Sequence, residues 1–300
     1  MNEKTMPLQS RVAIVTGAGA GLGRAHALML ARHGAKVVVN DLDLANASRV
    51  AEEITAAGGE AVPAAGSVTD ETQVAAMVNQ AMTAWGRVDI LVNNAGILRD
   101  KTFAKMSLAD FRLVLEVHLM GSVICSKAVW EIMRQQRYGR IVLTTSATGL
   151  YGNFGQSNYG AAKMGLVGLM QTLALEGEKY DIRVNCLSPS AATQMTQGIL
   201  PQEALNLLDP SVVSAGLLAL VNESAPSRAI LCAGAGHFAR AHVTLTDGRY
   251  IGNVADAAEQ VIARWDEIGD RSEEIVPAYG ALQAERELAS AGLKKPAADK

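Results

Sequence analysis

The 300-residue sequence has few cysteines, no block of basic residues and no long apolar run. Its only cysteines, Cys125, Cys186 and Cys232, stand singly among apolar neighbours, so neither disulfides nor a metal site is expected. A formal net charge of -3 gives no support for a nucleic-acid or membrane-surface partner. Residues 1–11 lack the apolar core of a signal peptide, and no apolar run reaches the roughly 18 residues of a membrane span. We therefore expect a cytoplasmic protein with reduced cysteines.

What the chain does contain is a regular alternation of strand and helix patterns. Runs of β-forming residues predict strands at 12–15, 36–40, 60–65, 88–92, 141–145, 182–187 and 229–233. Helices are predicted between them at about 22–32, 44–57, 70–85, 108–134 with a break near Gly121, 157–175 and 211–223. This order predicts an α/β fold with a doubly wound parallel sheet, whose ligands lie beyond the carboxyl ends of the strands.

A glycine-rich turn joins the first strand to the first helix. Gly17, Gly19, Gly21 and Gly23 follow one another at every second position after Thr16. Glycines at such a turn let the backbone approach a pyrophosphate, and the helix N-terminus supplies N–H donors with a partial positive charge. A glycine-rich string alone is weak evidence, but this one lies between a strand and a helix, which is the context that dinucleotide binding requires. We expect a dinucleotide to bind there.

Asp41 ends the second strand, about 20 residues beyond the glycines. A carboxylate at this place accepts hydrogen bonds from the adenosine ribose hydroxyls and repels a 2′-phosphate by about 4 kcal/mol at 4 Å in an effective dielectric of about 20. Ala18 and Ala20 are neutral, and the place of Arg24 in the helix does not clearly aim it at the ribose. The alternative is an ordinary loop carboxylate. NAD is favoured over NADP.

Three residues further along form a candidate catalytic group. Ser146 ends the fifth strand, and Tyr159 and Lys163 lie four residues apart on the helix that follows a glycine-punctuated loop. That spacing puts the phenol and the ammonium on one helix face. A neighbouring positive charge favours the phenolate and lowers its pKa from about 10 towards neutrality. Because a Tyr-x-x-x-Lys pair is common by chance as a solvated pair, the catalytic interpretation depends on the other motifs.

Together these motifs resemble the short-chain dehydrogenase/reductase family over about residues 10–235. They are Thr16-Gly17-x-x-x-Gly21-x-Gly23, Asn93-Asn94-Ala95-Gly96, Ser146 and Tyr159-x-x-x-Lys163, in the family's order and spacing. The resemblance implies a Rossmann-type domain with about seven parallel strands that transfers a hydride to or from a nicotinamide. Lys163 would hold the nicotinamide ribose and lower the pKa of Tyr159, Tyr159 would be the general acid/base, and Ser146 would hold the substrate oxygen.

Residues 37–42, 93–107, 117–122 and 151–163 resemble one branch in particular, the (3R)-hydroxyacyl-CoA dehydrogenase domain of peroxisomal multifunctional enzymes. That branch also resembles this chain at two departures from the wider family, which are His118 in place of the usual catalytic asparagine and Ser67 in place of the usual adenine-contacting aspartate. The cofactor contacts that the resemblance implies are Gly17, Gly21, Leu22, Gly23, Asp41, Ser67, Val68, Asn94, Ala95, Gly96, Tyr159, Lys163 and Pro189.

The expected activity is the NAD-dependent interconversion of a secondary alcohol and a ketone, with (3R)-3-hydroxyacyl-CoA as the first choice of substrate. The alternatives are a 17β-type hydroxysteroid dehydrogenase, a 3-oxoacyl carrier-protein reductase, and a non-catalytic nucleotide-binding protein. Residues 191–208 are predicted to form a loop and helix over the site, including Met195 and Thr196. A small-residue face on helix 157–175 predicts a homodimer or homotetramer.

The end of the chain departs from the family pattern. We predict a domain at residues 1–239 and an extension at 240–300, with a hairpin or short strands near 242–252, a helix at about 254–268 and a partly disordered tail from Gly269. The extension could pack on the domain or on a partner subunit.

Overall fold

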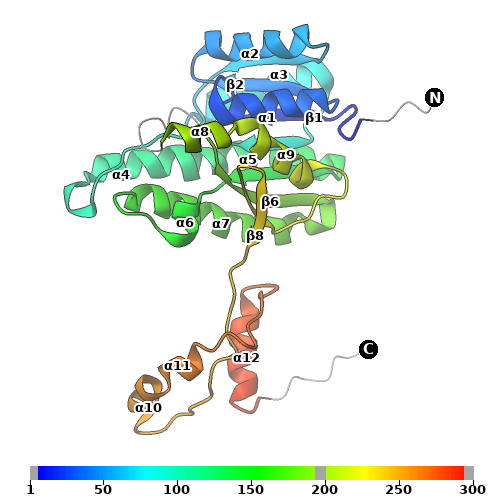
Figure 1. The fold of residues 1–300 in the computed structure, drawn as a ribbon. Coiled ribbons are helices and arrows are strands. Elements are labelled where there is room, and N and C mark those ends of the chain that lie inside the picture. The colour runs from blue at the N-terminus through cyan, green and yellow to red at the C-terminus, as the bar shows by residue number, and fades with distance from the viewer. Residues whose placement is uncertain (1–5, 193–200, 294–300) are drawn as a thin grey trace, which may run out of the picture. The chain divides into compact units, whose positions relative to one another are not determined.

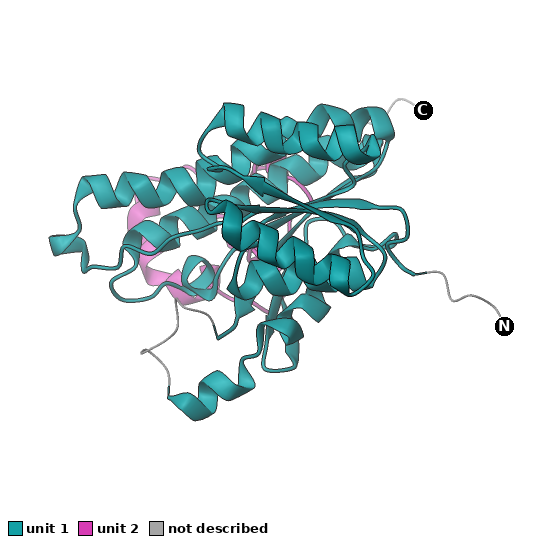
Figure 2. Cartoon of the chain, turned by 90° about the horizontal axis from the view of Figure 1, so that it is seen from above, with its two compact units in different colours: residues 1–241 teal, residues 242–300 magenta. Residues whose placement is uncertain are grey.

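The computed structural model describes residues 6–192 and 201–293. It divides the chain into two compact units, residues 1–241 (unit 1) and residues 242–300 (unit 2), which are described separately (Figures 1 and 2).

Unit 1 is built on one eight-stranded sheet with the order β3-β2-β1-β4-β5-β6-β7-β8. The strands are β1 (Val12–Val15), β2 (Lys36–Asp41), β3 (Ala61–Ala65), β4 (Ile90–Asn93), β5 (Gly139–Thr144), β6 (Ile182–Ser190), β7 (Ile230–Gly234) and β8 (His237–Ala241). The strand order reverses beside β1, as in doubly wound sheets that bind ligands at this switch point. The predicted parallel doubly wound sheet is therefore confirmed.

The sheet has one strand more than the family pattern implies. β8 pairs with β7 antiparallel, whereas every other pairing is parallel. The connection is only two residues, Ala235 and Gly236, and both have positive φ angles of 49° and 78°. Tight hairpin turns need such angles, so the chain reverses at once and adds the eighth strand.

Helices cover both faces of the sheet (Figure 1). One face is packed by α1 (Gly21–Arg32), α2 (Leu44–Ala56) and α9 (Pro210–Val221), and the other by α3 (Glu71–Trp85), α5 (Gly121–Gln136) and α7 (Ser157–Gly177). Successive strand residues alternate between these two cores because the side-chain period of a strand is two. Ala13 and Val15 join the first core, and Val12 and Ile14 the second.

The helical region predicted at 108–134 contains a π-helical turn just before Gly121. α4 (Leu108–Leu115) passes through this turn, Glu116–Met120, into α5 without a loop. A π turn adds a residue to the helical repeat and re-aims the side chains that it carries. Here it directs His118 into the interior, where the side chain is 2% exposed.

Residues 202–221 are apolar enough, by length and composition, to resemble a membrane-spanning helix. They form two helices, α8 (Gln202–Leu207) and α9, separated by Leu208 and Asp209. α9 rises only about 18 Å over its 12 residues, against about 30 Å for a bilayer core. It buries Val213 and Leu217 in the core of unit 1, so packing explains its apolar composition.

Short elements complete unit 1. They are two 3₁₀ turns, Phe103–Lys105 and Glu178–Tyr180, and the helix α6 (Ala147–Tyr151).

Unit 2 contains α10 (Ala257–Ala263), α11 (Trp265–Ile268), α12 (Ala281–Ser290) and one antiparallel bridge between Leu245 and Ile275. Within the tail from Gly269, where partial disorder is expected, the described residues include α12. In the stretch expected to form a hairpin or short strands, Leu245 pairs with the distant Ile275. Among the described residues 242–293, none is buried.

Candidate active site

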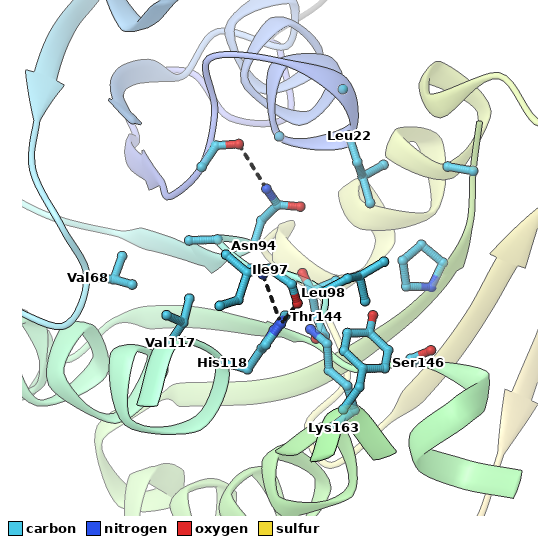
Figure 3. A pocket seen from close by; sticks show the side chains of 18 of the residues that line it. Leu22, Val68, Asn94, Ile97, Leu98, Val117, His118, Thr144, Ser146 and Lys163 are labelled. Atoms are coloured by element: carbon cyan, nitrogen blue, oxygen red, sulfur yellow. Dashed lines mark hydrogen bonds between the residues drawn. The ribbon is translucent and has the colours of Figure 1, made fainter. Parts of the chain in front are cut away.

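A cavity of about 610 Å³ opens at the carboxyl ends of the strands in unit 1 (Figure 3). Its lining includes every site residue named from the sequence. These are Gly17, Gly21, Leu22, Gly23, Asp41, Ser67, Val68, Asn94, Ala95, Gly96, His118, Ser146, Tyr159, Lys163 and Pro189. Segments that are far apart in the sequence meet here because parallel strands end at the same edge of the sheet. Ala191 and Leu208 also line the cavity, whereas Met195 and Thr196 lie outside the described residues.

The glycine turn has the close packing that a dinucleotide cradle requires. A Cβ atom on Gly23 would lie 2.2 Å from the carbonyl oxygen of Gly17 and 2.6 Å from Asn94 Nδ2. Gly17 itself has a φ of 61°, which favours glycine. α1 begins at Gly21 without a side-chain cap from Ala20, so its first N–H groups are available to an anion. The turn fits a pyrophosphate group.

Asn94 holds the glycine turn to β4. Its Nδ2 donates to the carbonyl oxygens of Thr16 at 3.0 Å and Gly17 at 3.1 Å, and its backbone N–H donates to Thr16 Oγ1 at 3.0 Å. Thr16 Oγ1 also accepts from the Ala95 N–H at 3.1 Å. Asn94 therefore fixes two walls of the cavity to each other.

Asp41 lies at the other end of the cavity, where the adenosine ribose is expected. Its Oδ2 accepts from the Gly19 N–H at 3.0 Å, and its Oδ1 accepts from the Asp43 N–H at 3.1 Å. Each carboxylate oxygen keeps a further lone pair that ribose hydroxyls can use. Asp41 thus also stabilises the glycine turn, a role that its position in the sequence does not indicate.

Ser146, Tyr159 and Lys163 line the opposite side of the cavity, where Figure 3 labels Ser146 and Lys163. Ser146 follows β5 and caps α6, with its Oγ accepting from the Thr148 N–H at 3.1 Å. Lys163 Nζ donates to the carbonyl oxygen of Thr144 and lies 5.4 Å from the centre of the Tyr159 ring. An ammonium has three donors, so two remain for a ligand in the cavity. The spacing predicted from the sequence does bring the three side chains together.

Burial controls the electrostatics of this group. It lowers the pKa of Lys163 to about 7, because the charged form loses its hydration. Burial also raises the pKa of Tyr159, while the hydrogen bond with Ser146 acts in the opposite direction. For the pKa of Tyr159 the net direction is upward, because loss of solvent outweighs the hydrogen bond with Ser146. The expected lowering of this pKa by Lys163 stays a prediction.

His118 packs against both the cofactor side and the catalytic side of the cavity. Its Nε2 lies 3.1 Å from the Ile97 backbone N and 2.8 Å from the Ile97 carbonyl oxygen. Its ring meets the Tyr159 ring edge-on at a centroid distance of 5.2 Å. A Cβ atom on Gly96 would lie 2.2 Å from His118 Cε1, so the ring occupies the space that the glycine leaves.

The pKa of His118 is lowered to about 3, mainly by burial and further by the positive charge of Lys163. The imidazole is therefore neutral at neutral pH. The backbone carbonyl oxygen of His118 accepts from Ser122 Oγ at 2.7 Å. These contacts make His118 a support for Tyr159 and for the backbone at Gly96–Ile97.

Two supporting residues were not found from the sequence. The carbonyl of Thr144 anchors Lys163, and the buried Asn158 joins α7 to the loop before α4 by donating to the Arg99 carbonyl oxygen at 3.0 Å. Asn158 directly precedes Tyr159, and that position is the only signal in the sequence that could have indicated it. The role of Thr144 belongs to its backbone and has no side-chain signal.

Comparison with known proteins decides the family. The family model described as short chain dehydrogenase matches residues 11–204. The chain belongs to this family. It is accordingly an oxidoreductase, and the family relationship together with an NADH-bound structural neighbour indicates a nicotinamide cofactor.

Three relatives show how this short-chain dehydrogenase compares with others. A short-chain type dehydrogenase/reductase of Mycobacterium tuberculosis is 47% identical over 88% of this chain and 96% of its own length. The peroxisomal multifunctional enzyme type 2 of Drosophila melanogaster is 52% identical over 71% of this chain, and this chain covers 37% of it. Its full-length structure matches with a TM-score of 0.80 and 39% identity, over 94% of this chain and 49% of that one. The resemblance to multifunctional-enzyme dehydrogenase domains is therefore confirmed.

A 7α-hydroxysteroid dehydrogenase solved with NADH and 7-oxo glycochenodeoxycholic acid also matches, with a TM-score of 0.73 and 31% identity over 79% of this chain and 97% of that chain. The fold thus occurs both in a steroid dehydrogenase and in a multifunctional enzyme.

Proposed function

We propose that this dehydrogenase uses NAD to interconvert (3R)-3-hydroxyacyl-CoA and 3-ketoacyl-CoA. The observation that carries the proposal is one cavity with Asp41 at its ribose end and Ser146, Tyr159 and Lys163 at its other end. The likeness to the Drosophila multifunctional enzyme favours an acyl-CoA over other secondary alcohols. Because this chain covers 37% of that enzyme, only the dehydrogenase activity is proposed for it.

The side chains have distinct tasks in this reaction. Bound NAD supplies the acceptor for the hydride that leaves the alcohol carbon. Ser146 Oγ, which is hydrogen-bonded with Tyr159 and accepts from the Thr148 N–H, holds the substrate oxygen beside the phenol. Tyr159 takes the alcohol proton as general base and returns a proton to the ketone in the reverse direction. Lys163 holds the nicotinamide ribose and, when protonated, favours the phenolate.

The pKa directions give the expected pH dependence. Alcohol oxidation needs the phenolate, and burial raises the pKa of Tyr159, so oxidation should accelerate as the pH rises above neutrality. Ketone reduction needs the protonated phenol and should slow over the same range. Opposite slopes in the two directions, measured as kcat/KM between pH 6 and 10, would support Tyr159 as the proton-transfer group. Equal slopes would contradict it.

NAD is proposed over NADP because the Asp41 carboxylate would lie beside a 2′-phosphate. Two like charges at about 4 Å repel by about 4 kcal/mol in an effective dielectric of about 20. We expect NADH to bind at least 100-fold more tightly than NADPH. Fluorescence titration of the two reduced cofactors tests this without any substrate.

The second candidate substrate is a hydroxysteroid, which the NADH-bound 7α-hydroxysteroid dehydrogenase favours. Apolar side chains suited to either an acyl chain or a steroid line the cavity at Ile97, Leu98, Val117 and Leu208. A carrier-protein-linked 3-oxoacyl chain reduced with NADPH is disfavoured by Asp41. The deciding experiment is a screen of NAD reduction across 3-hydroxyacyl-CoA chain lengths and hydroxysteroids, in which turnover of steroids alone would overturn the acyl-CoA proposal.

We also propose that the protein forms a homodimer or homotetramer in the cytoplasm. α7 exposes small and apolar residues on its outer side, namely Ala161, Met164, Gly168 and Leu175. No atom lies within 4 Å of a Cβ built on Gly168, which leaves room for a second helix. Because none of the described residues of unit 2 is buried, we propose that its apolar side chains pack on another surface. Light scattering at micromolar concentration tests this, and a monomer would contradict it.

A further inference from the structure

Arg49 lies beside the expected position of the adenosine ribose, although no motif marks it. It projects from α2, and its Nη2 donates to the carbonyl oxygen of Gly19 at 2.8 Å. On the other side of the same residue, the Gly19 N–H donates to Asp41 Oδ2 at 3.0 Å. The backbone at Gly19 is therefore held between a cation and an anion from two different elements.

Packing at this corner leaves no space for another side chain. A Cβ atom on Gly19 would lie 2.6 Å from Asp41 Oδ2 and 2.7 Å from the Asn46 Cβ. Asp41, Leu42 and Ala20 line the cavity at the same place. A group on the ribose oxygen nearest Asp41 would therefore lie next to the Gly19 backbone, which Arg49 also contacts.

The charge of Arg49 is available for such a group. Arg49 is exposed, and it has no ion-pair partner within 4.0 Å in the described part of the chain. A guanidinium has five N–H donors, of which the Gly19 carbonyl uses one. Arg24, the other nearby arginine, is already paired with Glu53, with its Nε 2.9 Å from Glu53 Oε2.

We propose that Arg49 is a second determinant of nucleotide selectivity and opposes Asp41. In the native chain Arg49 positions the Gly19 turn and partly offsets the repulsion that Asp41 exerts on a 2′-phosphate. When the charge of Asp41 is removed, Arg49 holds the 2′-phosphate of NADP. This inference rests on the proposed placement of the ribose at Asp41, and it goes further by naming the cation that faces it.

The test is a set of cofactor affinities that need no substrate. Dissociation constants of NADH and NADPH are measured by fluorescence titration for the native protein, Asp41→Asn, Arg49→Gln and the double variant. Asparagine keeps an acceptor oxygen for the Gly19 N–H, so the turn should remain intact. Circular dichroism and Tm confirm that each variant is folded.

We expect Asp41→Asn to tighten NADPH binding about tenfold or more, which corresponds to about 1.4 kcal/mol. Adding Arg49→Gln should remove most of that gain. The matched control is Asp41→Asn with Arg24→Gln, which should keep it. If the tighter NADPH binding of Asp41→Asn persists without Arg49, or is lost equally when Arg24 is replaced, the inference is overturned.

Two further measurements keep the result interpretable. Arg49→Gln alone should weaken NADPH binding more than NADH binding, and equal weakening would contradict a contact with the 2′-phosphate. Raising the salt concentration should weaken NADPH binding to Asp41→Asn more than to the double variant, because a solvent-exposed ion pair is screened. If the native protein binds neither cofactor, the proposed function fails; if NADH binds but Arg49 has no effect, only this inference fails.

Discussion

Units 1 and 2 bury their apolar side chains to very different extents. Unit 1 has two cores, one on each face of the sheet, with residues such as Ile14 and Ile141 fully buried. Among the described residues of unit 2 none is buried, and Ile262 and Trp265 are 77% and 68% exposed. Because apolar burial is the main favourable term in folding, unit 1 contains the source of its own stability and unit 2 does not.

The two units also differ in how far burial displaces the pKa values of their ionisable groups. Ionisable groups with large pKa displacements, His26, His118 and Lys163, all lie in the interior of unit 1. Burial can displace a pKa only where solvent is excluded, and unit 2 excludes little of it. The comparison can be tested by pairing three changes in unit 1 with the same changes in unit 2, and by one change in unit 1 alone.

The largest expected effect is on catalysis. Tyr159→Phe should lower kcat by about 100- to 10,000-fold, because the proton-transfer group is lost while the ring remains. The matched control is Tyr279→Phe in unit 2, which removes a phenol that donates to Glu285 and should leave kcat within about twofold. NADH affinity, measured by fluorescence, should be retained in both. Substantial turnover by Tyr159→Phe would rule out its assigned role.

The next largest effect is on stability. Ile141→Ala empties part of the core beneath β5 and should cost about 2–5 kcal/mol in the free energy of unfolding. Ile262→Ala removes the same atoms from an exposed position and should cost less than about 0.5 kcal/mol in dilute protein. Urea unfolding of both variants gives the comparison. A large cost for Ile262→Ala that grows with protein concentration would show that another chain covers this residue.

Glycine substitutions test the packing around the site. Gly96→Ala should reduce kcat/KM by about tenfold or more, about 1.4 kcal/mol, because the new methyl group displaces His118 from Tyr159 and Ile97. A Cβ on Gly280 in unit 2 would have no atom within 4 Å, so Gly280→Ala should leave kcat/KM unchanged. A second change, His118→Ser, makes room for the methyl group at residue 96. If the Gly96→Ala loss is the same in that background, the two positions are independent and the packing argument fails.

The effect that is smallest at neutral pH concerns acid stability. His26 is buried between α1 and α9, its Nδ1 lies 2.8 Å from Ser214 Oγ, and burial lowers its pKa to about 3. The unfolded chain, with a histidine pKa near 6.5, binds the proton first as the pH falls. The stability from neutral His26 is therefore complete above pH 6.5 and is lost towards pH 3. His26→Gln should reduce the slope of the free energy of unfolding against pH by up to about 1.4 kcal/mol per pH unit. Urea unfolding at pH 6, 5 and 4 would detect this change, and an unchanged slope would contradict it.

Local sequence patterns were sufficient for most of the fold and for the catalytic group. Strand periodicity, the glycine turn and the four-residue spacing of Tyr159 and Lys163 each depend on neighbours in the chain. Because parallel strands end at one edge, those local features also predicted which side chains meet there. The helix α12 within the tail from Gly269 could not be predicted, because a polar, alanine-rich composition does not distinguish a disordered segment from a helix.

Local sequence is enough to predict the doubly wound sheet, the glycine turn, Asp41 at the end of β2, and the grouping of Ser146, Tyr159 and Lys163. The folded chain is needed to show that His118 fills the space beside Gly96, that Arg49 and Asp41 both hold the Gly19 backbone, and that burial raises the pKa of Tyr159. These features depend on contacts between residues 22 to 30 positions apart and on the exclusion of solvent. Neither leaves a periodic pattern in the chain.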